Sequence, residues 1–157
     1  MKLIANLTIN TLTLDSAVYR ISCNVRSLAN GRRASHEVVL SVPDTLPYDP
    51  QPFPPGVWNV TGIQWREEKL FDYQTYGPVK IVTDAWRMVN VWELDDNGDY
   101  ARETERQVKD SGYLIHYSEY GTTLGCIRVT SPQDVIAIAR LIAAALEKKE
   151  SVQLEVI

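Results

Sequence analysis

His116 and Cys126 are the two residues whose types and spacing best fit catalytic chemistry. They stand ten positions apart, and the segment between them carries two glycines and two threonines. Such a connection can fold back and bring the two side chains together. A thiol with a pKa of about 8.5 is mostly protonated at neutral pH, and a neighbouring imidazole can take its proton to leave a thiolate–imidazolium pair. The pair therefore predicts a cysteine nucleophile with a histidine base.

Two neighbours of the cysteine complete this hypothesis. Gly125 precedes Cys126 and permits a backbone conformation in which the amides of both residues point at a developing oxyanion. Thr123 can orient the imidazole of His116 through its hydroxyl or carbonyl group, which would complete a three-part arrangement. A structural role remains open, because cysteine is among the most frequently buried residue types.

Three further residues flank the proposed pair. The guanidinium group of Arg128 suits a substrate carboxylate, with an internal salt bridge as the alternative. Tyr117 and Tyr120 can line a substrate groove or serve packing alone. Cys23 lies in an alternating segment and is predicted to be a buried small apolar residue. A disulfide between Cys23 and Cys126 stays open, and it would block the nucleophile.

The elements that must position these residues are mostly strands. Period-two alternation and β-branched residues predict strands over 3–14, 17–23, 37–42, 56–63, 79–83, 85–94, 113–117 and 152–157. One helix is expected over about 131–148, with Ser131 as its N-cap, Pro132 in its first position and Asp134 completing a capping box. The expected fold is a mainly β, α+β domain, because sheets must bury one face.

Two segments are predicted to be irregular. Residues 42–56 hold six of the eight prolines, which predicts an ordered loop rather than a linker between domains. Residues 95–112 are dense in charge and contain an Asn97-Gly98 turn, so we expect a solvated loop with a short exposed helix over 100–109. The acidic run at its start lacks the ligand spacing of a calcium loop.

Composition limits the partners. The net charge is −4, from 16 basic and 20 acidic side chains, which gives no electrostatic footprint for nucleic acid or an anionic membrane. The chain of 157 residues has two cysteines and two histidines, too few for a disulfide scaffold and barely enough for one zinc site, so neither a metal nor a cofactor is expected. No apolar stretch is long enough to span a bilayer or to serve as a signal peptide, so synthesis in the cytoplasm is expected.

The segment Thr123-Leu124-Gly125-Cys126-Ile127-Arg128 resembles the S/T-x-G-C-I/V-R signature of the L,D-transpeptidase catalytic domain, the YkuD-like family. His116 matches the family histidine on an upstream strand. The segments Pro54 to Val60 and Tyr76 to Val79 are similar to the family's T-P-x-G-x-F/W and G-P elements. The resemblance covers about 37–157 and implies a two-sheet β-sandwich in one catalytic domain over 1–157.

The resemblance implies a peptidoglycan substrate. Cys126 would attack the carbonyl of the diamino acid at the third position of the stem peptide and release D-alanine, with the thioester passing to water or to an amine. Two departures stand out: Tyr117 replaces the usual glycine after the histidine, and the connection to the cysteine is short. That connection is similar to those of compact type VI secretion toxins and of some phage relatives, and it implies a small lid.

The expected partners are therefore stem peptides, with an immunity protein or secretion apparatus as possible protein partners and a monomer as the simplest state. The implied role is an antibacterial effector that acts in the periplasm or on the cell wall after delivery. A phage lysis factor and an inactive β-rich binding or structural module are the alternatives. In cysteine hydrolases of the papain and NlpC/P60 types the cysteine precedes the histidine, and the opposite order here disfavours them.

Overall fold

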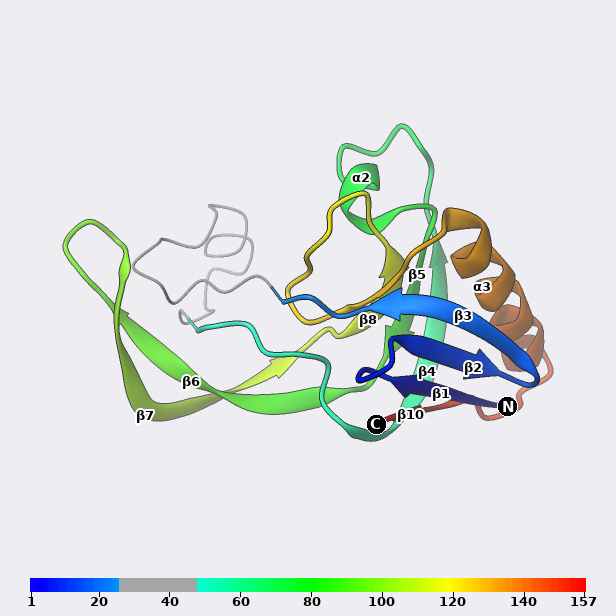
Figure 1. Ribbon diagram of the computed structural model, residues 1–157, viewed down its shortest axis with the longest axis horizontal. Helices are drawn as coiled ribbons and strands as arrows, with labels where there is room; N and C mark the ends of the chain where they lie inside the picture. Colours follow the sequence, from blue (N-terminus) through cyan, green and yellow to red (C-terminus); the bar gives the residue numbers. More distant parts are fainter. Residues whose placement is uncertain (26–47) are drawn as a thin grey trace.

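Eight strands form a closed barrel in the computed structural model, which describes residues 1–25 and 48–157 (Figure 1). Around the barrel the order is β1-β10-β4-β5-β8-β9-β3-β2. The barrel strands are β1 (Lys2–Asn6), β2 (Thr11–Leu14), β3 (Ala17–Ser22), β4 (Gly56–Trp65), β5 (Val79–Thr83), β8 (Leu114–Tyr117), β9 (Ile127–Val129) and β10 (Gln153–Val156). The predicted mainly β, α+β class is confirmed.

A second sheet leaves the barrel as a long hairpin. It consists of β6 (Trp86–Leu94) and β7 (Tyr100–Ser111), which pair with each other as an antiparallel ladder, and it extends to the left in Figure 1. The helices within the described residues are the short α2 (Tyr73–Tyr76) and the long α3 (Pro132–Glu147). The expected pattern of two sheets and one main C-terminal helix is confirmed.

The barrel interior is the core. Alternate residues of the strands point inward, as the buried positions of β5, β8 and β9 show at Ile81, Ile115 and Ile127, all at 0% exposure. The apolar face of α3 joins the same cluster through Val135, Ile138, Ala139, Ile142 and Ala145. Ser131 caps this helix as predicted, since its Oγ accepts from the Asp134 amide at 3.3 Å.

The predicted strand over 3–14 is two strands in the structure. The Asn6 side chain accepts hydrogen bonds from the amides of Thr8 and Ile9 at 3.0 and 3.3 Å, and Asn10 has a left-handed φ of 57°. Asparagine tolerates this backbone region and bonds to nearby amides, so the chain turns there. Apolar and polar residues alternate on both sides of the turn, but the phase shifts by one residue between Ile9 and Leu12, and that shift marks the break that the prediction missed.

The predicted loop and short helix over 95–112 are wrong, because residues 100–111 form β7. An isolated helix of this length is marginal in water, whereas pairing with β6 satisfies the backbone and places residues such as Arg102 opposite Glu93. The acidic residues at 95–99 stabilise the turn of the hairpin instead. The Asp95 carboxylate accepts hydrogen bonds from the amides of Asn97 and Asp99, each at 2.9 Å.

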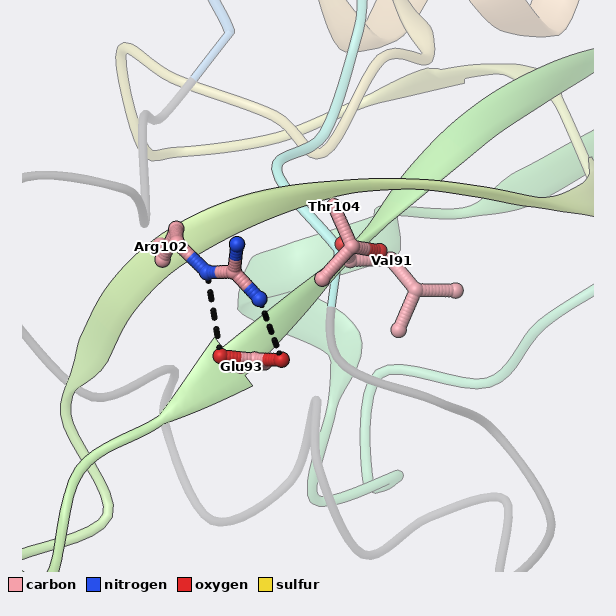
Figure 2. Close-up of polar contacts among 4 residues, drawn as sticks. All are labelled: Val91, Glu93, Arg102 and Thr104. Carbon is pink, nitrogen blue, oxygen red and sulfur yellow. Dashed lines mark hydrogen bonds and ion pairs between the residues drawn. The ribbon is translucent and has the colours of Figure 1, made fainter.

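Figure 2 shows how β6 and β7 are joined in this hairpin. Arg102 makes a two-point contact with Glu93, at 3.1 and 2.7 Å, and the Thr104 hydroxyl donates to the Val91 carbonyl at 2.6 Å. The ion pair is exposed, so it contributes little, while the backbone ladder carries the hairpin.

Most of the other predicted strands are present in the structure. The predicted strands at 17–23, 56–63, 79–83, 85–94, 113–117 and 152–157 correspond to β3, β4, β5, β6, β8 and β10. The predicted strand over 37–42 lies outside the described residues, as does the first part of the proline-rich loop. The described part of that loop, 48–55, is irregular apart from a bridge between Tyr48 and Val91.

Candidate active site

His116 and Cys126 lie on, or directly next to, two neighbouring parallel strands. His116 lies on β8 opposite Arg128 of β9, and Cys126 immediately precedes β9, two positions before that partner. Residues two apart share a face of a sheet, so Cys126 and His116 occupy diagonal positions on the face turned away from the barrel core. The sulfur accepts a hydrogen bond from the Leu114 amide at 3.4 Å, which ties Cys126 to β8.

The imidazole is buried and oriented by the backbone. His116 is 3% exposed, and its Nδ1 lies 2.9 Å from the Tyr117 carbonyl oxygen. With a hydrogen on Nδ1, this contact leaves Nε2 as the nitrogen that can take a proton. The Tyr76 ring packs edge-on against the imidazole at 5.3 Å between ring centres. The orienting contact predicted for Thr123 is thus made by the Tyr117 carbonyl.

Thr123 instead braces the turn that carries the cysteine. Its hydroxyl donates to the Cys126 carbonyl at 2.9 Å and accepts from the Gly125 amide at 3.2 Å. The Gly125 amide is therefore engaged within the turn. Of the two amides expected to face an oxyanion, that of Cys126 is the one that this bond does not occupy.

Gly125 fits a position that no other residue could occupy without strain. Its φ is +111°, and an added Cβ would stand 2.3 Å from the Gln51 carbonyl oxygen and 2.9 Å from the Tyr113 ring. The proline-rich loop and the start of β8 thus both press on the turn before Cys126. Glycine there serves close approach as well as backbone conformation.

The electrostatics at rest favour neutral groups. Burial lowers the pKa of His116 to about 4, against the contact with the Tyr117 carbonyl, and nearby Lys80 and Arg128 lower it further. Burial likewise raises the pKa of the Cys126 thiol to about 12, although the Leu114 amide works in the opposite direction. At neutral pH the free protein holds a thiol beside an uncharged imidazole, not the ion pair expected from the sequence.

The remaining predicted residues surround the pair. Arg128 donates from Nε to the Ser118 carbonyl at 2.7 Å and lies 5.5 Å from the centre of the Tyr117 ring. Tyr120 is 48% exposed and its hydroxyl donates to Gln74 at 3.3 Å, which links the loop before Cys126 to α2. Arg128 has no ion pair with a described residue, so its alternative as an internal salt bridge has no support there.

Cys23 lies beside the site without a covalent link to it. Both cysteines are free. The Cys23 thiol donates to the Gly125 carbonyl at 3.4 Å and accepts from the Phe53 amide at 3.5 Å. It is partly buried, in keeping with the small apolar residue expected, and burial raises the pKa of its thiol.

Sequence reasoning missed several residues that contact this site. Lys80 of β5 pairs with His116 across the antiparallel ladder, and Tyr76 of α2 covers both. Lys80 is the one charged residue in the otherwise apolar strand β5, and that could have marked it as a candidate site residue. Its position opposite His116 depends on the register between β5 and β8, which are distant in sequence and which no local pattern specifies.

Asp110 was missed as well, because it sits in a segment predicted to be solvated. It is buried and accepts hydrogen bonds from the hydroxyls of Tyr48 at 2.8 Å and Tyr113 at 2.6 Å. Desolvation and the adjacent carboxylate raise the pKa of both tyrosines, so both remain protonated donors. The cluster fastens β7 and the proline-rich loop to the start of β8.

Within 1–25 and 48–157, no three histidine, cysteine or acidic side chains are grouped so that they could hold a metal ion. No helix in the same ranges is long and apolar enough to cross a membrane.

The chain matches one known protein family. The model of the L,D-transpeptidase catalytic domain, YkuD, matches residues 23–152. Comparisons with curated proteins and with solved structures give no match. The match includes His116 and the whole cysteine turn. It leaves out all of β1, β2, β3 and β10, which the strand pairing nonetheless joins to the same barrel. The chain therefore belongs to the L,D-transpeptidase catalytic domain family of peptidoglycan enzymes.

Proposed function

We propose that this chain cleaves the bond between the diamino acid at position three and the D-alanine at position four of a peptidoglycan stem, through a thioester on Cys126. The observation that carries the proposal is the joint placement of His116 and Cys126 at diagonal positions on β8 and β9 within a chain of this family. The order and spacing of the two residues agree with the chemistry of a cysteine acyltransferase.

The steps follow from the neutral resting pair. On substrate binding, Nε2 of His116 takes the thiol proton as Sγ attacks the carbonyl carbon, and the Cys126 amide donates to the oxyanion. The carbon–nitrogen bond to D-alanine then breaks, and the imidazolium gives its proton to the leaving amine. Water or an amine next attacks the thioester, its proton passing through His116 back to the thiolate.

Hydrolysis and exchange with small D-amino acids are the outcomes we favour over cross-linking. The loop between His116 and the cysteine is short and is tied to α2 by the bond from the Glu119 amide to the Gln74 carbonyl at 2.9 Å. This loop leaves little surface to hold a bulky acceptor strand. The chain would act as one catalytic domain over 1–157, since β1 and β2 complete the barrel that carries the site.

A purified chain incubated with disaccharide tetrapeptides tests the reaction. Mass spectrometry should show loss of D-alanine, replacement by added D-methionine, and a tripeptide adduct on Cys126 in quenched samples. Cys126→Ala should abolish all three signals, and Cys23→Ser, which changes the other thiol, should retain turnover. Wild-type protein that neither releases nor exchanges D-alanine would contradict the proposal and favour an inactive binding module.

We propose in addition that the biological role is that of an antibacterial effector acting on the wall after delivery. The support is the short histidine–cysteine connection, which resembles that of compact toxins of this family. A copy directed to the periplasm of a Gram-negative host should arrest growth or cause lysis, whereas the Cys126→Ala copy should not. Equal growth of both strains would refute the effector role while leaving the in vitro reaction standing.

A further inference from the structure

Three basic or titratable side chains stand in one row beside the site. Lys80 of β5 pairs with His116 of β8, which pairs in turn with Arg128 of β9. A direct chain neighbour of each residue is fully buried in the core: Ile81 follows Lys80, Ile115 precedes His116, and Ile127 precedes Arg128. Because side chains alternate along a strand, the row lies on the opposite face, the one that also carries Cys126.

The positive charge in this row is not balanced by the described residues. Lys80 lies 3.8 Å from the centre of the Tyr76 ring and forms no ion pair with a described carboxylate. Burial lowers the pKa of Lys80, and nearby Arg66 lowers it further. Among residues 1–25 and 48–157, the acidic side chain that pairs with these cations is Asp72: it forms an ion pair with Arg66, and its charge raises the pKa of Lys80 against the other two effects.

Arg66 supplies a second, independent sign of a missing partner. Its side chain is 9% exposed, and its guanidinium group lies 5.3 Å from the centre of the same Tyr76 ring. The Nε atom is buried and has no hydrogen-bond partner among the described residues. A buried, unpaired donor on a cation costs free energy, so this region is built to receive an acceptor.

We propose that Lys80, backed by Arg66, forms an anion subsite beside His116 that binds a carboxylate of the peptide substrate. The inference rests on the proposed function and adds to it a recognition residue on β5. A carboxylate is the natural occupant, since it would neutralise the row and accept hydrogen bonds from ammonium and guanidinium donors. A stem tetrapeptide offers two sources close to the scissile bond, the C-terminal carboxylate and the side-chain carboxylate of a diaminopimelate at position three.

Steady-state kinetics on three synthetic tetrapeptides separates these sources. The first peptide carries both carboxylates, the second has a C-terminal amide, and the third has lysine in place of diaminopimelate. Lys80→Met should raise KM for the first peptide about tenfold with kcat little changed, and Lys80→Arg should restore most of the affinity. The peptide that lacks the recognised carboxylate should bind wild type and Lys80→Met equally weakly.

Lys109→Met is the matched control, because Lys109 also lies over an aromatic ring, 5.2 Å from the centre of Trp86, but is exposed on β7. It should leave KM unchanged for all three peptides. If Lys80→Met keeps the wild-type KM for every peptide, the subsite is refuted while the reaction stands.

If the protein binds the peptides without cleaving them, calorimetric titration measures the affinity for each of the same three peptides. Affinity that falls in Lys80→Met and recovers in Lys80→Arg would then support the subsite and contradict the proposed reaction. Wild-type protein that binds none of the peptides would overturn both proposals.

Discussion

At the scale of single residues, the site is a closely packed turn held by side-chain contacts as well as a pair of reactive groups. The hydroxyl of Thr123 bridges the Gly125 amide and the Cys126 carbonyl, and Gly125 lies against Gln51 and Tyr113. Because the Cys126 amide is the proposed oxyanion donor, the geometry of this turn sets both the nucleophile and the group that stabilises its product.

Thr123→Val tests this bracing role. Valine keeps the shape but removes both hydrogen bonds, so we expect the kcat of D-alanine release to fall roughly tenfold or more through misplacement of the Cys126 amide. Thr123→Ser keeps the hydroxyl and should retain most activity. The two variants are compared by kcat and by melting temperature. Equal kcat in Thr123→Val and Thr123→Ser would mean that the turn needs no bracing.

At the scale of elements, local sequence signals were enough to single out the candidate residues but not the residues that surround them. The cysteine motif, its upstream histidine and the capped helix α3 are encoded in short segments, and the sequence predicted them. Lys80 and the Tyr117 carbonyl became part of the site through the register of β5, β8 and β9, which no local pattern specifies. The strand β7 was missed because its many charged residues are typical of a solvated loop, and its strand conformation depends on pairing with β6.

The hairpin of β6 and β7 is fastened near the site through one buried carboxylate. Asp110 accepts from Tyr48 and Tyr113, and the Tyr100 hydroxyl also donates to the Tyr48 carbonyl at 3.0 Å. The Tyr113 ring in turn packs at 5.4 Å between ring centres against Phe53 of the proline-rich loop. The hairpin and the loop are therefore coupled to the turn that holds Gly125.

Asp110→Ala should release this coupling. The variant removes the acceptor of the buried Tyr113 hydroxyl, at a cost of roughly 1–3 kcal/mol, and that of the partly buried Tyr48 hydroxyl, at a smaller cost. Hydrogen exchange should accelerate in β6, β7 and residues 48–55, while β1 and β10 stay protected. Glu103→Ala, which removes an exposed carboxylate from the same strand, serves as the control. Unchanged exchange in the hairpin of Asp110→Ala would show that the backbone ladder alone holds it.

At the scale of the whole molecule, the barrel keeps its proposed base neutral by burying it. His116 is 3% exposed, and burial and the neighbouring cations lower its pKa to about 4. An unfolded chain would bind a proton at this histidine below a pH of about 6.5, before the folded chain does. Folding stability must therefore fall as the pH drops from about 6.5 towards 4, and this contribution is fully present above that window.

His116→Gln separates this effect from the titration of carboxylates. Between pH 7 and pH 4.5, the histidine should cost the wild type about 2.5 kcal/mol of unfolding free energy that the glutamine variant does not lose. Urea denaturation of both chains at the two pH values gives the difference, and His36 is present in both, so its titration cancels. The variant can be less stable at pH 7 through lost packing without affecting the comparison, because only the change with pH is used. Parallel losses in the two chains would show that the imidazole is solvated in the folded protein, and the proposed base would then be charged at mildly acidic pH.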